Sequence, residues 1–407
     1  MGPKKNNNTK PLTASQQKIL KILQTDIVER YFNPAESDAD FELLSTLRYD
    51  PGFTHVFLQS GKESHEIRLE EIDYRLQADS FADALNNAES GSEGNTTRFS
   101  DIFDELTTSS SFDNENDNSL MSLLESTYES QNSSPPAPAS FAASQQENTD
   151  LRATFFQRFL LLGEHYKRLN FALQFFKWEF HVPLKMLLDK LIDALPEHHE
   201  ISNLEERMKL LINENHCYKM RVLISKTGRM RIEAHPILPT LPLTPAITSS
   251  RYFMETILGG FLPNSSTTWD VFVDTKPMSV SPFTTFKTTY RDHYNEARGR
   301  LEELASTFGS NGKREILVYN DAHQLMEGSI TNVALVKTRE DNDEQLRFIT
   351  PSLNSGCLCG TMRHYLLKKY LICEEPIDVR HLVQGDTVIL FNGVMGAVKG
   401  VVRNALK

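Results

Sequence analysis

The feature that most limits how this chain can fold is a long acidic stretch within it. Residues 76–150 carry 14 Asp and Glu side chains against one basic residue, Arg98, which gives a net charge of −13. The stretch is also rich in Ser, Asn and Gln and shows little apolar periodicity. Such a composition buries too little apolar surface to offset the entropy cost of ordering. We therefore expect a disordered insertion within a domain, which a fold tolerates because loop closure costs only about 0.6 kcal/mol per doubling of length.

The rest of the chain is close to neutral, with a net charge of +2. With 407 residues, 39% of them hydrophobic, the chain is long enough to bury the cores of two domains. It offers no basic face that could follow a phosphate backbone, which argues against nucleic acid as a partner. No apolar run approaches the roughly 18 residues of a bilayer span, and the N-terminal "MGPKKNNNTKPL" lacks the apolar core of a signal peptide. We therefore expect no membrane association and a cytoplasmic location.

The four cysteines are too few and too unevenly spaced to form a disulfide framework. A reducing compartment is the expectation that follows. The pair Cys357-x-Cys359 could suggest a zinc site, but the second Cys or His pair that a structural zinc needs is absent at matching spacing. The sequence therefore predicts no metal site.

Helix and strand patterns lie on both sides of the acidic stretch. Before it, apolar residues at helical spacing predict a short helix within 13–32, and residues 41–59 resemble two strands around an Asp50-Pro51-Gly52 turn. Directly after it we expect an amphipathic helix, or a strand leading into one, at 154–180, and two further helices at 183–195 and 202–213. A hairpin closed at Thr227-Gly228 is expected at 217–237 and a strand at 268–278.

The last third of the chain contains more strands than helices. A helix is expected to begin near Lys287 and to end at Gly309. A second helix, over 361–372, interrupts strands expected at 315–320, 330–337, 346–351 and 387–403. This order is typical of an α+β domain built on a barrel-like sheet.

Two residues of this region carry chemistry that suits pyridoxal 5'-phosphate (PLP). Lys287, in "FTTFKTTYRDHY", offers an amine that could hold the cofactor's aldehyde as a Schiff base, and a helix start at this position would lower its pKa. Glu327, in "MEGSITN", offers a carboxylate for the pyridine nitrogen, worth about 4 kcal/mol at about 4 Å with an effective dielectric constant of about 20. The alternatives are a solvated surface lysine and an exposed turn carboxylate.

A phosphate group would need an anion site, and three segments could supply it. Gly360 and Thr361 stand directly before a helix, where backbone N–H groups are free. Arg168, in "EHYKRL", has a planar guanidinium that suits a phosphate. Asn392-Gly393 offers a tight backbone turn at a strand end. Each segment alone has an ordinary structural explanation: a helix start, an exposed helix arginine and a hairpin turn.

The order of these motifs resembles the fold-type IV PLP enzymes. This group contains branched-chain aminotransferases, D-amino-acid transaminases and aminodeoxychorismate lyases, and the chain is most similar to the aminodeoxychorismate lyases of fungi. The similarity covers about residues 26–75 and 151–405 and rests on "STLRYDPG", "EHYKRL", "FKTTYRDHYNEAR", "MEGSITNVAL" and "GTMR". The acidic stretch has no counterpart in compact members. The early "GDG" of the group reads "DADFELL" here.

The resemblance implies a fold, a domain division and a reaction. Residues 1–25 would be a tail with the start of a helix, and residues 26–272 an N-terminal α/β domain interrupted by the insertion. Residues 273–285 would be a linker, and residues 286–407 a C-terminal PLP-binding pseudo-barrel. The fold resembles that of D-amino-acid aminotransferases, in which a homodimer is usual. The reaction converts 4-amino-4-deoxychorismate, a small molecule, into 4-aminobenzoate and pyruvate for folate biosynthesis. An aminotransferase of the same fold, and a non-catalytic interaction protein on a degenerate fold, remain alternatives.

The resemblance also implies roles for individual residues. Lys287 is the expected catalytic residue and the expected covalent attachment point of the cofactor. The other expected cofactor-binding residues are Arg168, Glu327, Gly360, Thr361, Asn392 and Gly393. The candidates for recognising the substrate carboxylates are Arg48, Ser329, Thr331 and Asn332.

Overall fold

The computed structural model describes residues 40–54, 151–244, 247, 249–262, 265, 268–339 and 342–406. Three features expected from the sequence lie outside the described residues. They are the helix within 13–32, the second strand of 41–59, and the insertion at 76–150.

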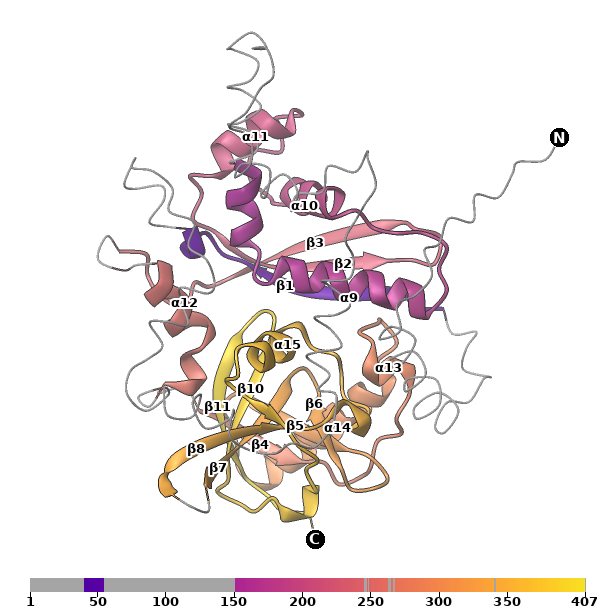
Figure 1. The fold of residues 1–407 in the computed structure, drawn as a ribbon, viewed down its shortest axis with the longest axis vertical. Coiled ribbons are helices and arrows are strands. Elements are labelled where there is room, and N and C mark those ends of the chain that lie inside the picture. The colour runs from indigo at the N-terminus through magenta and orange to yellow at the C-terminus, as the bar shows by residue number, and fades with distance from the viewer. Residues whose placement is uncertain are drawn as a thin grey trace, which may run out of the picture.

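A three-stranded antiparallel sheet forms the upper part of the molecule in Figure 1, in the order β1-β2-β3. Its strands are β1 (Leu43–Tyr49), β2 (Cys217–Ile224) and β3 (Met230–Ile237). The β2–β3 hairpin turns through Gly228, whose φ of 83° suits a glycine. The hairpin expected at Thr227-Gly228 is thereby confirmed.

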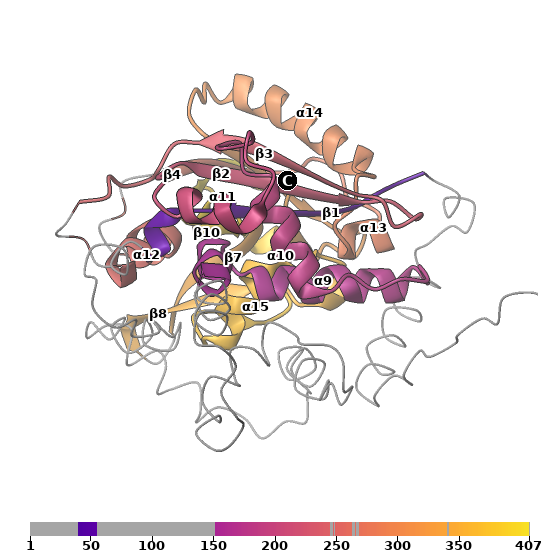
Figure 2. The ribbon, with the colours of Figure 1, turned by 90° about the horizontal axis from the view of Figure 1, so that it is seen from above.

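Three helices pack against one face of this sheet (Figures 1 and 2). They are α9 (Leu162–Phe175), α10 (Leu184–Asp193) and α11 (Leu204–Leu211). Alternate residues of β1, namely Leu43, Leu47 and Tyr49, enter one buried apolar cluster with these helices. The Asn203 side chain accepts hydrogen bonds from the first N–H groups of α11 and so fixes where that helix begins. The helices expected at 183–195 and 202–213 are confirmed, within a few residues at their ends. The pattern expected at 154–180 forms two helical stretches, over 151–158 and α9, separated by a β-bridge at Phe159 and a left-handed Leu161.

The lower part of the molecule is an eight-stranded mixed sheet that curls (Figure 1), in the order β6-β5-β4-β11-β10-β7-β8-β9. Its strands are β4 (Thr268–Val273), β5 (Arg314–Tyr319), β6 (Leu325–Gly328), β7 (Asn332–Arg339), β8 (Asn342–Thr350), β9 (Cys373–Glu374), β10 (Thr387–Asn392) and β11 (Gly396–Val402). Along β10, Val388 and Leu390 enter one apolar cluster while Ile389 and Phe391 enter another. The sheet is therefore buried on both faces, and the expected α+β class is confirmed.

Helices and short 3-10 turns complete the fold. The helices are α12 (Ser249–Ile257), α13 (Pro282–Thr285), α14 (Asp292–Thr307) and α15 (Thr361–Lys368). The 3-10 turns are η3 (Pro51–Thr54), η4 (Gly259–Phe261), η5 (Leu353–Ser355) and η6 (Val379–His381). The short α13 begins at a capping box formed by Ser281, with Pro282 in its first turn. No helix of the described residues is long and apolar enough to cross a bilayer.

Some boundaries differ from the sequence expectations. Strand β4 pairs in parallel with β5 and β11, so it belongs to the large sheet. A boundary before residue 268 therefore fits the sheet pairing better than one at 272. Residues 387–403 form a hairpin of two strands, because Asn392 and Gly393 turn the chain. Two helices and two strands were not expected: α12, α13, β6 and β9.

The two sheets meet along the free edge of β1. The Leu44 N–H donates to the Lys287 carbonyl (2.9 Å) and the Thr289 N–H donates to the Glu42 carbonyl (2.9 Å). Leu43 and Thr288 form an antiparallel bridge. The segment around Lys287 thus pairs with the small sheet, while the helix and strands that follow it belong to the large one.

Candidate active site

Lys287 is the centre of the site. It lies between α13 and α14, and its backbone is fixed by the hydrogen bond from Leu44 on β1. Burial lowers the pKa of the Lys287 amine to about 7, and the charges of Arg168 and Arg291 act in the same direction. An amine with such a pKa is largely neutral just above neutral pH, as a nucleophile or a proton acceptor must be.

The expected cause of this low pKa is wrong. The sequence predicted that a helix starts at Lys287, but α14 begins five residues later, at Asp292. Pairing with β1 holds residues 287–289 extended, so no helix N-terminus lies at the amine. Burial and neighbouring arginines produce the effect instead.

Glu327 lies on β6 and is 2% exposed, so it is not the exposed turn carboxylate of the alternative reading. Its Oε1 accepts a hydrogen bond from the Tyr294 hydroxyl (2.5 Å) and its Oε2 accepts one from Asn332 Nδ2 (3.1 Å). Burial raises the pKa of Glu327 to about 8 against the opposing effect of the Tyr294 hydrogen bond and the charges of Arg291 and Lys287. Lys287 and Glu327 therefore each shift the pKa of the other, as expected of groups that face one site.

Arg168, on α9, is buried and forms no ion pair with an acidic side chain among the described residues; Glu164, which lines the same pocket, pairs with Lys167 and His364 instead. The hydrogen-bond acceptors that the structure gives its guanidinium are uncharged: the Ser45 hydroxyl (3.0 Å) and the Cys359 carbonyl (3.5 Å). Burial lowers the pKa of Arg168 to about 10. A buried cation held by neutral groups is costly unless an anion joins it. This end of the site therefore suits an anionic ligand.

His165 connects the groups around Arg168. Its Nδ1 lies 2.7 Å from the Ser45 hydroxyl and its Nε2 lies 3.2 Å from the Thr361 hydroxyl. Burial and the charges of Arg168 and Lys287 hold the pKa of His165 well below its usual value, so the ring is neutral. Neither His165 nor Ser45 was expected from the sequence. The i, i+3 spacing of His165 and Arg168 was the available signal, because it places both on one helix face.

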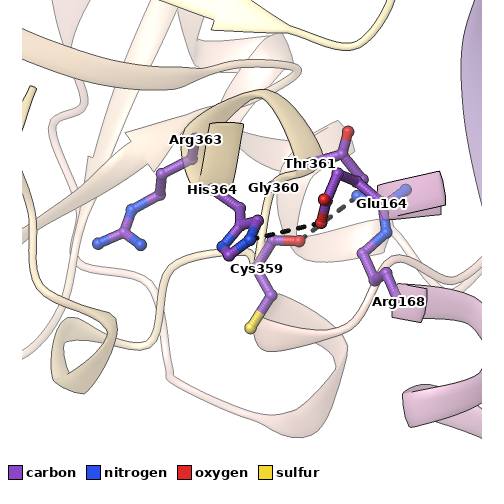
Figure 3. A pocket seen from close by; sticks show the side chains of 7 residues that line it. All are labelled: Glu164, Arg168, Cys359, Gly360, Thr361, Arg363 and His364. Carbon is purple, nitrogen blue, oxygen red and sulfur yellow. Dashed lines mark hydrogen bonds and ion pairs between the residues drawn. The ribbon is translucent and has the colours of Figure 1, made fainter. Parts of the chain in front are cut away.

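A pocket opens between α9 and α15 beside Arg168 (Figure 3). Its lining residues are Glu164, Arg168, Cys359, Gly360, Thr361, Arg363 and His364. Gly360 is the N-cap residue of α15, and no side chain of the described residues caps this helix start. The first turn of α15 can thus direct backbone N–H groups at an anion.

Two expected glycines allow close approach of the backbone. A Cβ on Gly360 would lie 1.8 Å from Asn332 Oδ1, and a Cβ on Gly393 would lie 2.8 Å from His165 Nε2. The β10–β11 turn therefore lies against the Arg168 cluster. Asn392 holds this turn, since its Oδ1 accepts the N–H groups of the next two turn residues and its Nδ2 donates to the Ile330 carbonyl (3.1 Å).

The hydroxyls of Ser329 and Thr331, which we expect to contact the substrate, form hydrogen bonds within the protein. Both hydroxyls donate to the buried carboxylate of Glu315, at 2.6 and 3.0 Å. Glu315 also accepts the N–H groups of Ser329 and Ile330, so it holds this turn rigidly. Asn332 supports Glu327 instead of facing solvent. The three residues build the site wall, and Glu315 is a residue that the sequence did not reveal.

Arg48, the remaining substrate-binding candidate, lies in a buried cluster with Asp50, Thr240 and Tyr252. Its guanidinium forms a buried ion pair with Asp50 (2.6 Å) and donates to the Thr240 hydroxyl (3.3 Å). The Tyr252 hydroxyl donates to the same Asp50 carboxylate. Arg48 is connected to the site through its backbone, since its N–H donates to the Gly393 carbonyl (3.0 Å).

The Cys357-x-Cys359 pair is buried beside this site. Burial raises the pKa of both thiols to about 12, so they are protonated at neutral pH. No cluster of three or more potential metal ligands occurs in the parts of the chain that the structure describes.

Comparison with known proteins agrees with this arrangement. Residues 156–401 match the family model described as Amino-transferase class IV. The aminodeoxychorismate lyase of Saccharomyces cerevisiae is 38% identical over 384 residues, covering 90% of this chain and 94% of that protein. A proposed aminodeoxychorismate lyase of Schizosaccharomyces pombe is 27% identical over 203 residues, covering 49% of this chain and 72% of that protein.

A solved structure of a proposed amino-acid aminotransferase from Mesorhizobium loti aligns with a TM-score of 0.42 at 20% identity, covering 60% of this chain and 92% of that one. The family match extends over more than half of the chain, and the yeast relative is similar over nearly all of it. The resemblance found in the sequence motifs is confirmed. The chain belongs to the class IV aminotransferase family.

Proposed function

We propose that this protein is an aminodeoxychorismate lyase, which converts 4-amino-4-deoxychorismate into 4-aminobenzoate and pyruvate with PLP as cofactor. The observation that carries the proposal is the position of the Lys287 amine. Burial lowers its pKa to about 7, the charge of Arg168 acts in the same direction and the charge of Glu327 acts against it, so both charges act on this one amine. The 38% identity to the yeast lyase over 90% of the chain supports the choice of reaction.

The residues present fit PLP at three points. Arg168, the Thr361 hydroxyl and the first turn of α15 would hold the phosphate, and Gly393 has no Cβ to crowd that space. Lys287 would hold the aldehyde carbon, and Glu327 would pair with the ring nitrogen. When bound, PLP withdraws electrons from the carbon that loses a proton.

Lys287 is the only residue of this set suited to move the proton. Its Nζ takes the proton from C4 of the substrate ring, the C3–O bond breaks, and the ring becomes aromatic as the enolpyruvate leaves. The same Nζ then returns a proton to the methylene carbon of the enolpyruvate, which gives pyruvate. One base with a pKa near the working pH can serve in both directions.

Glu327 supplies the negative charge that would pair with the ring nitrogen of PLP. Its carboxyl group is oriented by Tyr294 and Asn332 and is buried away from water. A carboxylate held there stabilises a protonated ring nitrogen and thus the electron withdrawal from the substrate carbon. The Glu315 turn supports this orientation, because it fixes the residues between Glu327 and Asn332.

The experiment is a turnover assay with purified protein, PLP and 4-amino-4-deoxychorismate, detecting 4-aminobenzoate and pyruvate. We expect both products in equal amounts without any 2-oxo acid. The Lys287→Ala variant should lose turnover by at least about 10³-fold and lose the visible absorbance of bound cofactor, while its far-UV circular dichroism stays unchanged. Product formation that requires a 2-oxo acid would instead identify an aminotransferase.

We also propose that the protein acts as a homodimer in the cytoplasm. The dimer rests on the family resemblance, and the location rests on the four free cysteines, which suit a reducing compartment. Light scattering of the eluted protein measures the mass directly. A monomer with full activity would contradict the dimer.

A further inference from the structure

We propose that Arg221 and Arg291 bind the two carboxylates of the substrate. The inference rests on the proposed function, since it concerns the same site. 4-Amino-4-deoxychorismate carries one carboxylate on its ring and one on its enolpyruvyl group. A site for this dianion needs cations beyond the one committed to the cofactor phosphate.

Strand register places Arg221 on the same sheet face as the catalytic lysine. Lys287 lies opposite Leu44, because the neighbouring residues 43 and 288 form the antiparallel bridge. Thr46 follows Leu44 by two positions on β1, and it pairs with Arg221 on β2. Directly opposite residues share a face, as do residues two apart on one strand. The side chains of Lys287 and Arg221 therefore project from one face, two strands apart.

Arg291 approaches the amine from the other side. It follows Lys287 by four residues, and its Nη2 donates to the Ser329 carbonyl (2.8 Å). Its guanidinium carbon lies 4.9 Å from the centre of the Tyr294 ring, and Tyr294 in turn bonds Glu327. Arg291 thus lies beside the residue that bonds Glu327.

Both guanidiniums keep donors available. An arginine has five N–H donors. In the described part of the chain, Arg221 uses Nη1 for Glu233 (2.7 Å), a carboxylate that also bonds Arg231 and His235. The side chain of Arg221 is 34% exposed, so a ligand can reach it. Both arginines lower the pKa of the Lys287 amine, which shows that their charges reach the reaction centre.

The test uses chorismate, which carries the same two carboxylates but lacks the amine that reacts with the cofactor. Binding is measured by calorimetry on the PLP-loaded wild type and on the variants Arg221→Met and Arg291→Met. We expect each variant to bind chorismate about 10- to 100-fold more weakly, as for loss of one charge-assisted contact. In turnover, KM for aminodeoxychorismate should rise more than kcat falls.

The matched control is Arg347→Met. Arg347 lies on β8, and its guanidinium pairs with the Glu375 carboxylate (2.6 Å). The Arg347→Met variant should bind chorismate as the wild type does. The cofactor absorbance and the circular dichroism of all variants show whether each is folded and loaded. Wild-type chorismate affinity in a loaded Arg221 or Arg291 variant overturns the assignment of that arginine.

A wild-type protein that binds chorismate but produces no 4-aminobenzoate would instead contradict the proposed reaction. The two failures are therefore distinguishable. Binding of 4-aminobenzoate, which carries only the ring carboxylate, then sorts the two roles. A variant that binds chorismate more weakly but binds 4-aminobenzoate as the wild type does has lost the contact to the enolpyruvyl carboxylate.

Discussion

At one end of the Lys287 site a cation is buried among neutral groups, and at the other end a carboxyl group is buried among neutral donors. Arg168 bonds a hydroxyl and a carbonyl, and burial lowers its pKa to about 10. Glu327 bonds a phenol and an amide, and burial raises its pKa to about 8. In both cases the buried environment works against the charged form.

The shared feature is that neither group has the opposite charge in a direct ion pair among the described residues. In the proposed function, the phosphate of PLP would supply that charge to Arg168, and a protonated ring nitrogen would supply it to Glu327. The two ends differ in what they control: the phosphate end should determine how tightly the cofactor is held, and the ring end should determine how fast the bound enzyme works. Perturbed groups of this kind are typical of functional sites.

The largest effect is expected at the ring end. Glu327→Gln keeps the shape and the hydrogen-bonding capacity of the side chain but removes the charge. We expect kcat to fall about 10²- to 10³-fold, because a contact of about 4 kcal/mol to the ring nitrogen is lost. The dissociation constant of PLP, measured by fluorescence titration, should change less than about tenfold.

The control for this variant is Glu375→Gln, a carboxylate with a 41% exposed side chain directly after β9, the edge strand at the other end of the sheet order from β6. It should retain the wild-type kcat. If Glu327→Gln keeps a kcat within threefold of the wild type, the ring-end role of Glu327 is wrong.

At the phosphate end the expected change is in affinity. Arg168→Met should weaken PLP binding about 100-fold, since a charge-assisted contact to a dianion is removed, while Arg168→Lys should recover part of it. The apo form of Arg168→Met should be no less stable than the wild type, because the variant no longer buries an unpaired cation. Saturating PLP should restore most of kcat in Arg168→Met. If Arg168→Met stays inactive when it is saturated with PLP, Arg168 does more than hold the cofactor, and its role does not differ from that of Glu327 as proposed.

Some parts of this site could be predicted from the sequence. Lys287, Glu327, Arg168 and the Gly360-Thr361 helix start were found because each carries its chemistry within a short local motif. The groups that support them come from distant parts of the chain. Ser45 and His165 are 120 residues apart, and Tyr294 reaches Glu327 across 33 residues.

The missed elements have the same physical cause. The helix start at Asp292 was misplaced because pairing with β1, and not local propensity, holds the Lys287 segment extended. The place of strand β4 in the large sheet could not be predicted locally, because its pairing with β11 joins residues more than 100 positions apart. Local patterns therefore predicted the elements and the reactive groups, whereas their partners depended on tertiary pairing.

The pH dependence of apo-protein stability should show opposite signs for the two titrating groups near the ring. The folded pKa of Glu327, about 8, lies above its ordinary value of 4.5, so its contribution to stability is full below about pH 4.5 and is lost as pH rises through about 8. The folded pKa of Lys287, about 7, lies below its ordinary 10.5, so its contribution is full above about pH 10.5 and is lost as pH falls through about 7.

Urea unfolding of apo wild type and Glu327→Gln between pH 5 and 9 measures the first of these effects. The stability of the wild type relative to the variant should fall by roughly 3 kcal/mol across this range. For Lys287→Met, the relative stability of the wild type should instead fall as pH decreases from 10 to 6. Parallel curves for wild type and variants would mean that neither group is shifted.

The smallest effect is expected for the group that orients Glu327. Tyr294→Phe removes one hydrogen bond to Glu327 Oε1 and leaves the aromatic packing in place. Because this bond lowers the pKa of Glu327, its loss should raise that pKa and move the acidic limb of the kcat profile to higher pH. We expect kcat at neutral pH to fall about 3- to 10-fold, in line with about 1 kcal/mol for one hydrogen bond. Tyr370→Phe, at an exposed position, serves as the control and should leave the profile unchanged. A lower kcat without the shifted limb would mean that Tyr294 acts through packing and not through the proton of Glu327.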